Sequence, residues 1–168
     1  MKSIFKLLVA AFLTVAPLTI SAQSNVAHIN VQQLISEMPE VIAAQNELAK
    51  LEKDYSTQID NAFKEFQTKA QSYSSDAANQ TDVTNQARQK ELESMQTNLQ
   101  ELRDSAAQEL QKKQMDLMTP LLEKARNAIT KVGEEQGFNY VIDSSPNGGI
   151  ILANGKDLLA DVKKELGF

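Results

Sequence analysis

The sequence predicts an α+β protein, mainly α, in which a long antiparallel helical hairpin forms an arm on a small β body. Residues 39–136 contain no Gly except Gly133 and, after Pro39 itself, no Pro except Pro120, and they are rich in helix-forming residues. Their apolar residues recur with a helical period, and β-rich segments flank the stretch on both sides. We therefore assign the arm to residues 39–136 and the body to residues 23–38 and 137–168.

The first 22 residues have the order of a secretory signal peptide, which is basic, then apolar, then small. Lys2 and Lys6 precede the apolar run 7–13, and Ser21-Ala22 supplies the small residues. The alternative is a membrane anchor, but even the longer stretch 7–20, which contains Pro17, has only 14 residues, whereas a spanning helix needs about 20. The chain has no Cys to carry a lipid anchor. We expect cleavage near Ala22 and export of residues 23–168 to the periplasm.

The outgoing half of the arm is predicted to begin at Pro39, which suits the first position of a helix because its missing N–H costs nothing there. Its apolar positions follow steps of three and four residues that add up to an 11-residue repeat. This period predicts nearly straight or slightly right-handed arms rather than a left-handed supercoil. The positions are Leu48, Leu51, Tyr55, Ile59, Ala62, Phe66, Ala70, Tyr73 and Ala77.

The returning half has the same mean spacing, with one polar position near Lys113 or Gln114. The chain is predicted to turn back within residues 74–82, which are short, polar and rich in residues that compete with the helix backbone. Thr81 and Asp82 are both candidates to cap the return helix. One continuous helix with a polar patch is the alternative. The apolar positions of this half are Met95, Leu99, Leu102, Ala106, Leu110, Leu117, Leu121, Ala125, Ala128 and Val132.

The body is predicted from both ends of the chain. A strand and a short helix occupy residues 25–38. Towards the C-terminus, the β-rich segments 138–143 and 150–153 flank turn residues and predict a β-hairpin. A short amphipathic helix follows at 157–166 and ends at Gly167.

This body is near the lower size limit for a self-sufficient core, and its strands carry apolar residues on both faces. Association of several subunits would hide these residues and anchor several arms at one base. The residues expected at the subunit contacts are Val26, Ile29, Phe138, Tyr140, Val141, Ile142, Ile150, Ile151 and Leu152.

Composition excludes several classes of function. The chain carries 17 basic and 22 acidic residues, which argues against a general nucleic-acid binder. It has no Cys, and its single His28 is expected to be a body residue rather than a catalyst. Residues 147–149 resemble a phosphate loop only by their glycines. We expect no catalytic residue, no cofactor and no metal.

The order of these segments resembles the Skp (OmpH) family of periplasmic chaperones over the whole mature chain. No single motif is diagnostic, but their order and spacing together are specific. The matching segments are 27–31, 38–40, 121–132, 137–143 and 157–167, and Pro120 within the return helix is a further similarity.

The resemblance implies a jellyfish-like homotrimer, in which a β-barrel-like body carries three arms around a cavity. It implies an ATP-independent holding chaperone for unfolded outer-membrane proteins. The candidate client-binding residues are the larger apolar groups in the tipward half of the arm: Phe63, Phe66, Tyr73, Met95 and Leu99. Phe63 is the strongest candidate because it lies beside the regular apolar stripe.

One departure concerns charge. Well-known family members are strongly basic, whereas residues 40–77 of this chain carry four basic and seven acidic residues. Whether the protein makes peripheral contact with lipopolysaccharide or anionic lipid is therefore left open. Stable membrane insertion is not expected. Apolar contact should contribute more than charge to the binding of clients. The alternative function is a periplasmic structural or adaptor coiled-coil hairpin protein, although residues 23–38 and 137–168 are short for the flanking β domains of an adaptor.

Overall fold

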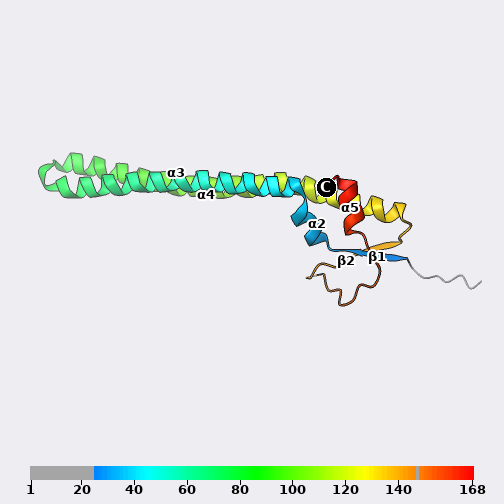
Figure 1. Ribbon diagram of the computed structural model, residues 1–168. Helices are drawn as coiled ribbons and strands as arrows, with labels where there is room; N and C mark the ends of the chain where they lie inside the picture. The colour runs from blue at the N-terminus through cyan, green and yellow to red at the C-terminus, as the bar shows by residue number, and fades with distance from the viewer. Residues whose placement is uncertain (1–24, 147) are drawn as a thin grey trace, which may run out of the picture.

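The computed structural model describes residues 25–146 and 148–168, so the predicted signal peptide lies outside the described residues. It shows a long, nearly straight helical arm that extends from a small body at one end (Figure 1). The described elements follow the order β1, α2, α3, η1, α4, β2, β3 and α5 along the chain.

The predicted antiparallel hairpin is confirmed. Helix α3 spans Pro39–Asp76, a single 3₁₀ turn η1 spans Ala77–Asn79, and helix α4 returns over Asp82–Glu135. The Thr81 side chain caps α4, because its hydroxyl oxygen accepts a hydrogen bond from the Thr84 amide at 3.2 Å. With 38 residues, α3 is about 57 Å long.

The predicted 11-residue stripe forms the contact between the two helices. Every predicted position from Leu48 to Ala77 is at least half-buried, and so is every predicted position from Met95 to Val132. Lys113 fills the predicted polar position and pairs with Glu47 at 2.7 Å. Lys124 pairs with Glu40 at 2.6 Å nearer the body. The two helices of the arm are therefore held together by one narrow apolar stripe and by ion pairs spaced along it.

The sheet of the body is parallel throughout. Strand β1 (Val26–Ile29) lies in the centre, with β2 (Tyr140–Asp143) on one side and the two-residue β3 (Lys156–Asp157) on the other. Val26 is in register with Tyr140, and His28 is in register with both Ile142 and Asp157.

The predicted C-terminal β-hairpin is wrong. Residues 150–153 form no strand, and β2 pairs with β1 instead of with the segment that follows it. Strands β2 and β3 run parallel to each other on opposite sides of β1, and the chain between Asp143 and Lys156, whose described residues form an irregular loop, joins them. Ile150, Ile151 and Leu152 remain largely exposed on this loop.

Helices α2 (Val31–Glu37) and α5 (Leu159–Leu166) complete the body. The Asn30 side chain caps α2, with its Oδ1 accepting from the Gln33 amide at 2.9 Å. Gly167 ends α5 with a φ of 91°, a left-handed conformation that favours glycine. The core lies where these elements meet the base of the arm: Ala27, Ile29, Leu34, Met38, Val41, Ala125, Ala128, Val132, Leu158 and Val162.

Candidate functional site

The middle of the arm carries a hollow that we call the mid-arm groove. It has a volume of about 600 Å³. Phe63 and Phe66 come from α3, one helical turn apart. A stripe of α4 provides the opposite wall and consists of Glu93, Gln96, Thr97, Leu99, Gln100 and Arg103.

The floor of the mid-arm groove is apolar and its rim is polar. Leu99 is only 7% exposed and forms part of the helix–helix contact, whereas Phe63 is 39% exposed and lies beside that contact. Glu93 and Arg103 add one negative and one positive charge at the rim. Such a surface offers an apolar side chain a place to pack while the rest of the segment stays hydrated.

A second hollow of about 300 Å³ contains Ala62, Met95 and Leu102. Leu99 lines both hollows, so it lies between them. Glu65 and Lys69 complete the second hollow, and their 3.8 Å ion pair gives it a more polar edge. Of the two hollows, the mid-arm groove is the one that contains exposed aromatic surface.

The tip of the arm is cross-linked by a polar network in addition to the apolar stripe. Glu91 on α4 accepts a hydrogen bond from Lys69 Nζ at 2.5 Å and another from the Tyr73 hydroxyl at 2.6 Å. The Arg88 guanidinium lies 4.7 Å from the centre of the Tyr73 ring and pairs with Asp76 at 3.1 Å. We call these five residues the tip network.

The tip network shifts the pKa values of its members in the direction expected for ion pairs. The bonds from Lys69 and then Tyr73 lower the pKa of Glu91, and in return Glu91 raises the pKa of both donors. Arg88, followed by Asn79, lowers the pKa of Asp76. Both carboxylates are therefore held in the charged form at neutral pH.

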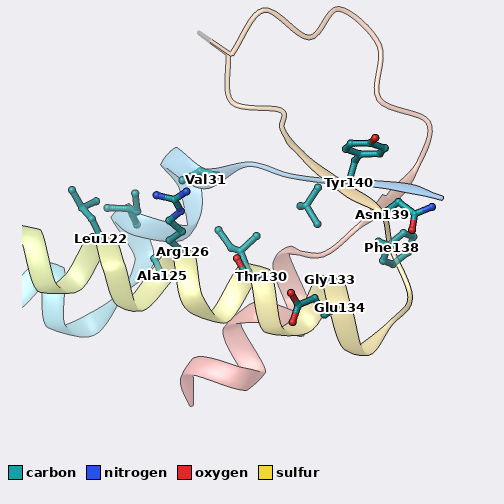
Figure 2. A pocket seen from close by; sticks show the side chains of 13 residues that line it. Val31, Leu122, Ala125, Arg126, Thr130, Gly133, Glu134, Phe138, Asn139 and Tyr140 are labelled. Carbon is teal, nitrogen blue, oxygen red and sulfur yellow. The ribbon is translucent and has the colours of Figure 1, made fainter. Parts of the chain in front are cut away.

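The body presents an apolar surface on the side of the sheet that faces away from α4. In Figure 2, Tyr140 points away from α4 on this side. Tyr140 is 63% exposed and Ile151 fully exposed. We call Val26, Tyr140, Ile142, Ile150, Ile151 and Leu152 the outer face. A groove of about 520 Å³ lies on the other side, between α2, α4 and β2, where Val31 and Arg126 line it (Figure 2).

Comparison with known proteins identifies the family. The family described as outer membrane protein (OmpH-like) matches residues 25–166. The chain belongs to the OmpH-like family.

Two curated relatives of this OmpH-like chain are each named chaperone protein Skp. The protein from Pectobacterium atrosepticum is 20% identical over 151 residues, which cover 90% of both chains. The protein from Yersinia enterocolitica is 27% identical over 148 residues, which cover 85% of this chain and 86% of that protein. These relatives support a chaperone role.

A solved structure has the same fold. It is a putative outer membrane chaperone (OmpH-like) from Caulobacter crescentus CB15, with a TM-score of 0.76 and 12% sequence identity over 86% of this chain and 85% of that chain. The OmpH-like family is a family of non-enzymatic chaperones. This OmpH-like chain is accordingly not an enzyme.

The geometry around the single histidine agrees with the family. The His28 Nδ1 lies 3.2 Å from the Ser144 hydroxyl, but the nearby Asp143 carboxylate binds Ser145 and the Val31 amide instead of the imidazole. The pair therefore lacks the acid that orients a catalytic histidine. Residues 25–146 and 148–168 contain no cluster of three potential metal ligands. Among the same residues, no helix is both long and apolar enough to cross a bilayer.

The structure separates the sequence-predicted client-binding residues into three groups. Phe63 and Phe66 line the mid-arm groove, while Leu99 and Met95 belong mainly to the helix–helix contact. Tyr73 belongs to the tip network. Of the predicted subunit-contact residues, Ile29 is 1% exposed within the core of its own subunit. Phe138 and Val141 also pack against that core.

Sequence reasoning missed the tip network. Lys69, Glu91, Arg88 and Asp76 were not singled out as a group. A signal was available, because acids and bases occur on both sides of the turn at positions that an antiparallel hairpin brings together. The same reasoning missed Arg103 at the rim of the mid-arm groove, for which the spacing of four residues from Leu99 was the available signal.

Proposed function

We propose that this chain is an ATP-independent holding chaperone of the periplasm that binds unfolded outer-membrane proteins. Three copies would join through their bodies, and their arms would surround the client. Membership of the OmpH-like family and the two relatives named chaperone protein Skp support this proposal. The basic, apolar and small order of residues 1–22 supports export.

The mid-arm groove is the observation that carries the proposal. It exposes part of an aromatic ring, Phe63, on an arm whose other groove-lining residues are mostly polar. A holding chaperone needs apolar contact with unfolded chains, but a large apolar patch would make the chaperone itself aggregate. Separated apolar hollows with hydrated rims meet both requirements.

The outer face of the body supports association into a trimer. Ile151 is fully exposed and Leu152 is 75% exposed in the isolated subunit. A body of this size is near the lower limit for a self-sufficient core, so covering the outer face with further copies would add burial that a single subunit lacks. Light scattering should find three chains per particle, and a stable folded monomer at micromolar concentration would contradict the trimer.

The test of client binding is suppression of aggregation of an unfolded outer-membrane barrel protein. We expect Phe63→Ser to weaken suppression several-fold with helicity and mass unchanged, because Phe63 lies beside the helix–helix contact. Val83→Ser is the matched control. It removes an apolar side chain that is 77% exposed near the start of α4, outside the mid-arm groove.

The dependence of holding on salt concentration is a second test. The mature chain is acidic, with 15 basic and 22 acidic residues once Lys2 and Lys6 are removed. Holding through apolar contact should survive salt that screens a mainly electrostatic complex. If holding is lost in moderate salt while Phe63→Ser behaves as wild type, charge and not apolar contact carries the binding.

A further inference from the structure

The only histidine of the chain, His28, lies on the same side of the body sheet as the outer face. In the central strand β1, Ala27 and Ile29 point into the core and are 0% and 1% exposed. Side chains alternate along a strand, so Val26 and His28 point the other way, and both are half-buried. His28 therefore lies at the centre of the sheet, on the side that the proposed trimer would cover.

The surroundings of His28 are apolar. It lines a small cavity of about 230 Å³ between the sheet and the connecting loop, and no other side chain lining that cavity can ionise. Ile142 contributes from β2, while Ile150 and Leu152 contribute from the loop. The loop lies across the sheet from α4 and α5 (Figure 1), so the helices of this subunit do not cover it.

The titratable groups on neighbouring elements are engaged elsewhere. The Asp157 carboxylate, in register with His28 on β3, accepts from the Leu159 amide at 2.9 Å. Lys156 pairs with Asp161 at 3.2 Å. On β2, the Asp143 carboxylate binds Ser145, and the remaining titratable group is the phenol of Tyr140. The imidazole itself contacts only a neutral hydroxyl, that of Ser144.

We propose that assembly of the trimer through the outer face is coupled to the protonation of His28. This inference rests on the proposed function, in which the outer face is the contact between copies. A neutral imidazole fits an apolar interface because one ring nitrogen is satisfied by the Ser144 hydroxyl. A cationic imidazole there has no hydrogen bond to a carboxylate, because the Asp157 carboxylate in register with it accepts from the Leu159 amide, and removing such a charge from water is costly. Acid therefore favours separated subunits, in which the charged ring is hydrated.

The sign of the coupling follows from which state binds more protons. Histidine changes charge between about pH 5 and pH 8. Because the proposed contact accepts only the neutral ring, association weakens as the pH falls. Three copies supply three imidazoles. Because the cavity between the arms exists only in the trimer, the cavity is lost when acid separates the subunits.

Nearby carboxylates do not account for such an effect. Partial burial raises the pKa of Asp143, but hydrogen bonds from the Ser145 side chain and amide and from the Val31 amide outweigh burial and lower it overall. Gln136 and Lys156 lower the pKa of Asp161. Both groups remain charged between about pH 5 and pH 8, so neither accounts for a change in association over this range.

The experiment measures particle mass by light scattering over a dilution series of the mature chain at about pH 7.5 and about pH 5.5. We expect the trimer association constant of the wild type to fall about tenfold or more at the lower pH. His28→Gln, which keeps a polar neutral side chain, should remove this fall. Asp116→Asn, which removes an exposed charge on α4 outside the outer face, is the control and should keep it.

Each outcome is decisive. A wild-type trimer whose association is unchanged by pH, or a His28→Gln variant with the same fall as wild type, overturns this inference alone. A wild type that is not a trimer at pH 7.5 overturns the trimer of the proposed function as well. If His28→Gln does not fold, His28→Leu gives the same comparison, because leucine suits an apolar interface and carries no charge at any pH. Helicity measured by circular dichroism at both pH values separates dissociation from unfolding.

Discussion

The arm and the body are built by different means from the same chain. In the body, Leu34, Met38 and Leu158 are completely buried, and strands and helices from both ends of the sequence meet around them. Along the arm between Ala44 and Ala125, the described residues include only two buried side chains, Leu99 and Ala106. The body therefore depends on a three-dimensional core, whereas the arm depends on a single line of contact.

This difference shows how a protein can carry a long exposed structure without a core of its own. A helix satisfies its backbone hydrogen bonds within itself, so each half of the arm needs a partner only along one stripe. Ion pairs such as Glu47–Lys113 and Lys69–Glu91 join the two halves where the apolar stripe is thin. The remaining surface is free to contact other molecules.

The largest expected effect is in the body. Leu34→Ala should lower the free energy of unfolding by about 2–5 kcal/mol, because the side chain is completely buried and the space it leaves cannot fill easily. Urea unfolding, followed by the loss of helicity, measures this change. A loss below about 1 kcal/mol would mean that the body core is not the main source of stability.

The same contrast explains what could be predicted from the sequence. The arm was predicted well because its evidence is local: a period of 11 residues, Pro39 at the start and Thr81 at the turn. The sheet was predicted poorly because its pairing is non-local. Val26 pairs with Tyr140, and nothing in the pattern of either strand specifies that the pairing is parallel. Ile150 to Ala153 have the composition of a strand but no partner within the described part of the subunit.

The candidate site shows the same limit. Helical spacing identified Phe63 as lying beside the stripe and Leu99 as lying on it, and the structure agrees with both placements. Spacing could not show that Tyr73 turns its hydroxyl to Glu91 and its ring to Arg88, because those contacts depend on how the two helices are aligned across the turn.

An intermediate effect is expected at the contact between the two helices of the arm. Leu99→Ala should lower the free energy of unfolding by about 2 kcal/mol, at the low end for a buried leucine, because only two helices surround it. Hydrogen exchange should accelerate around Leu99 and remain unchanged at Tyr140 to Ile142 in the body. Phe63→Ala is the control on the exposed side and should change stability less. Equal acceleration in arm and body would show that the two parts unfold together.

The smallest expected effect concerns the tip network and its response to acid. Hydrogen bonds from Lys69 and then Tyr73 lower the pKa of Glu91 in the folded arm, and Arg88 does the same for Asp76. A carboxylate with a lowered pKa in the folded state stabilises that state above its unfolded pKa, and the contribution is lost as the pH falls through the folded value. Protection of the tip should therefore be constant from about pH 7 to pH 5 and decline below about pH 4.

Hydrogen exchange of amides between Ser72 and Arg88 measures this decline, after correction for the intrinsic dependence of exchange on pH. Glu91→Gln keeps the shape of the side chain but has no charge to lose. It should exchange faster than wild type at neutral pH and show a shallower decline in acid. If the variant and the wild type have the same protection at pH 7, the ion pairs at the tip contribute nothing, and the arm is held only by its apolar stripe along its whole length.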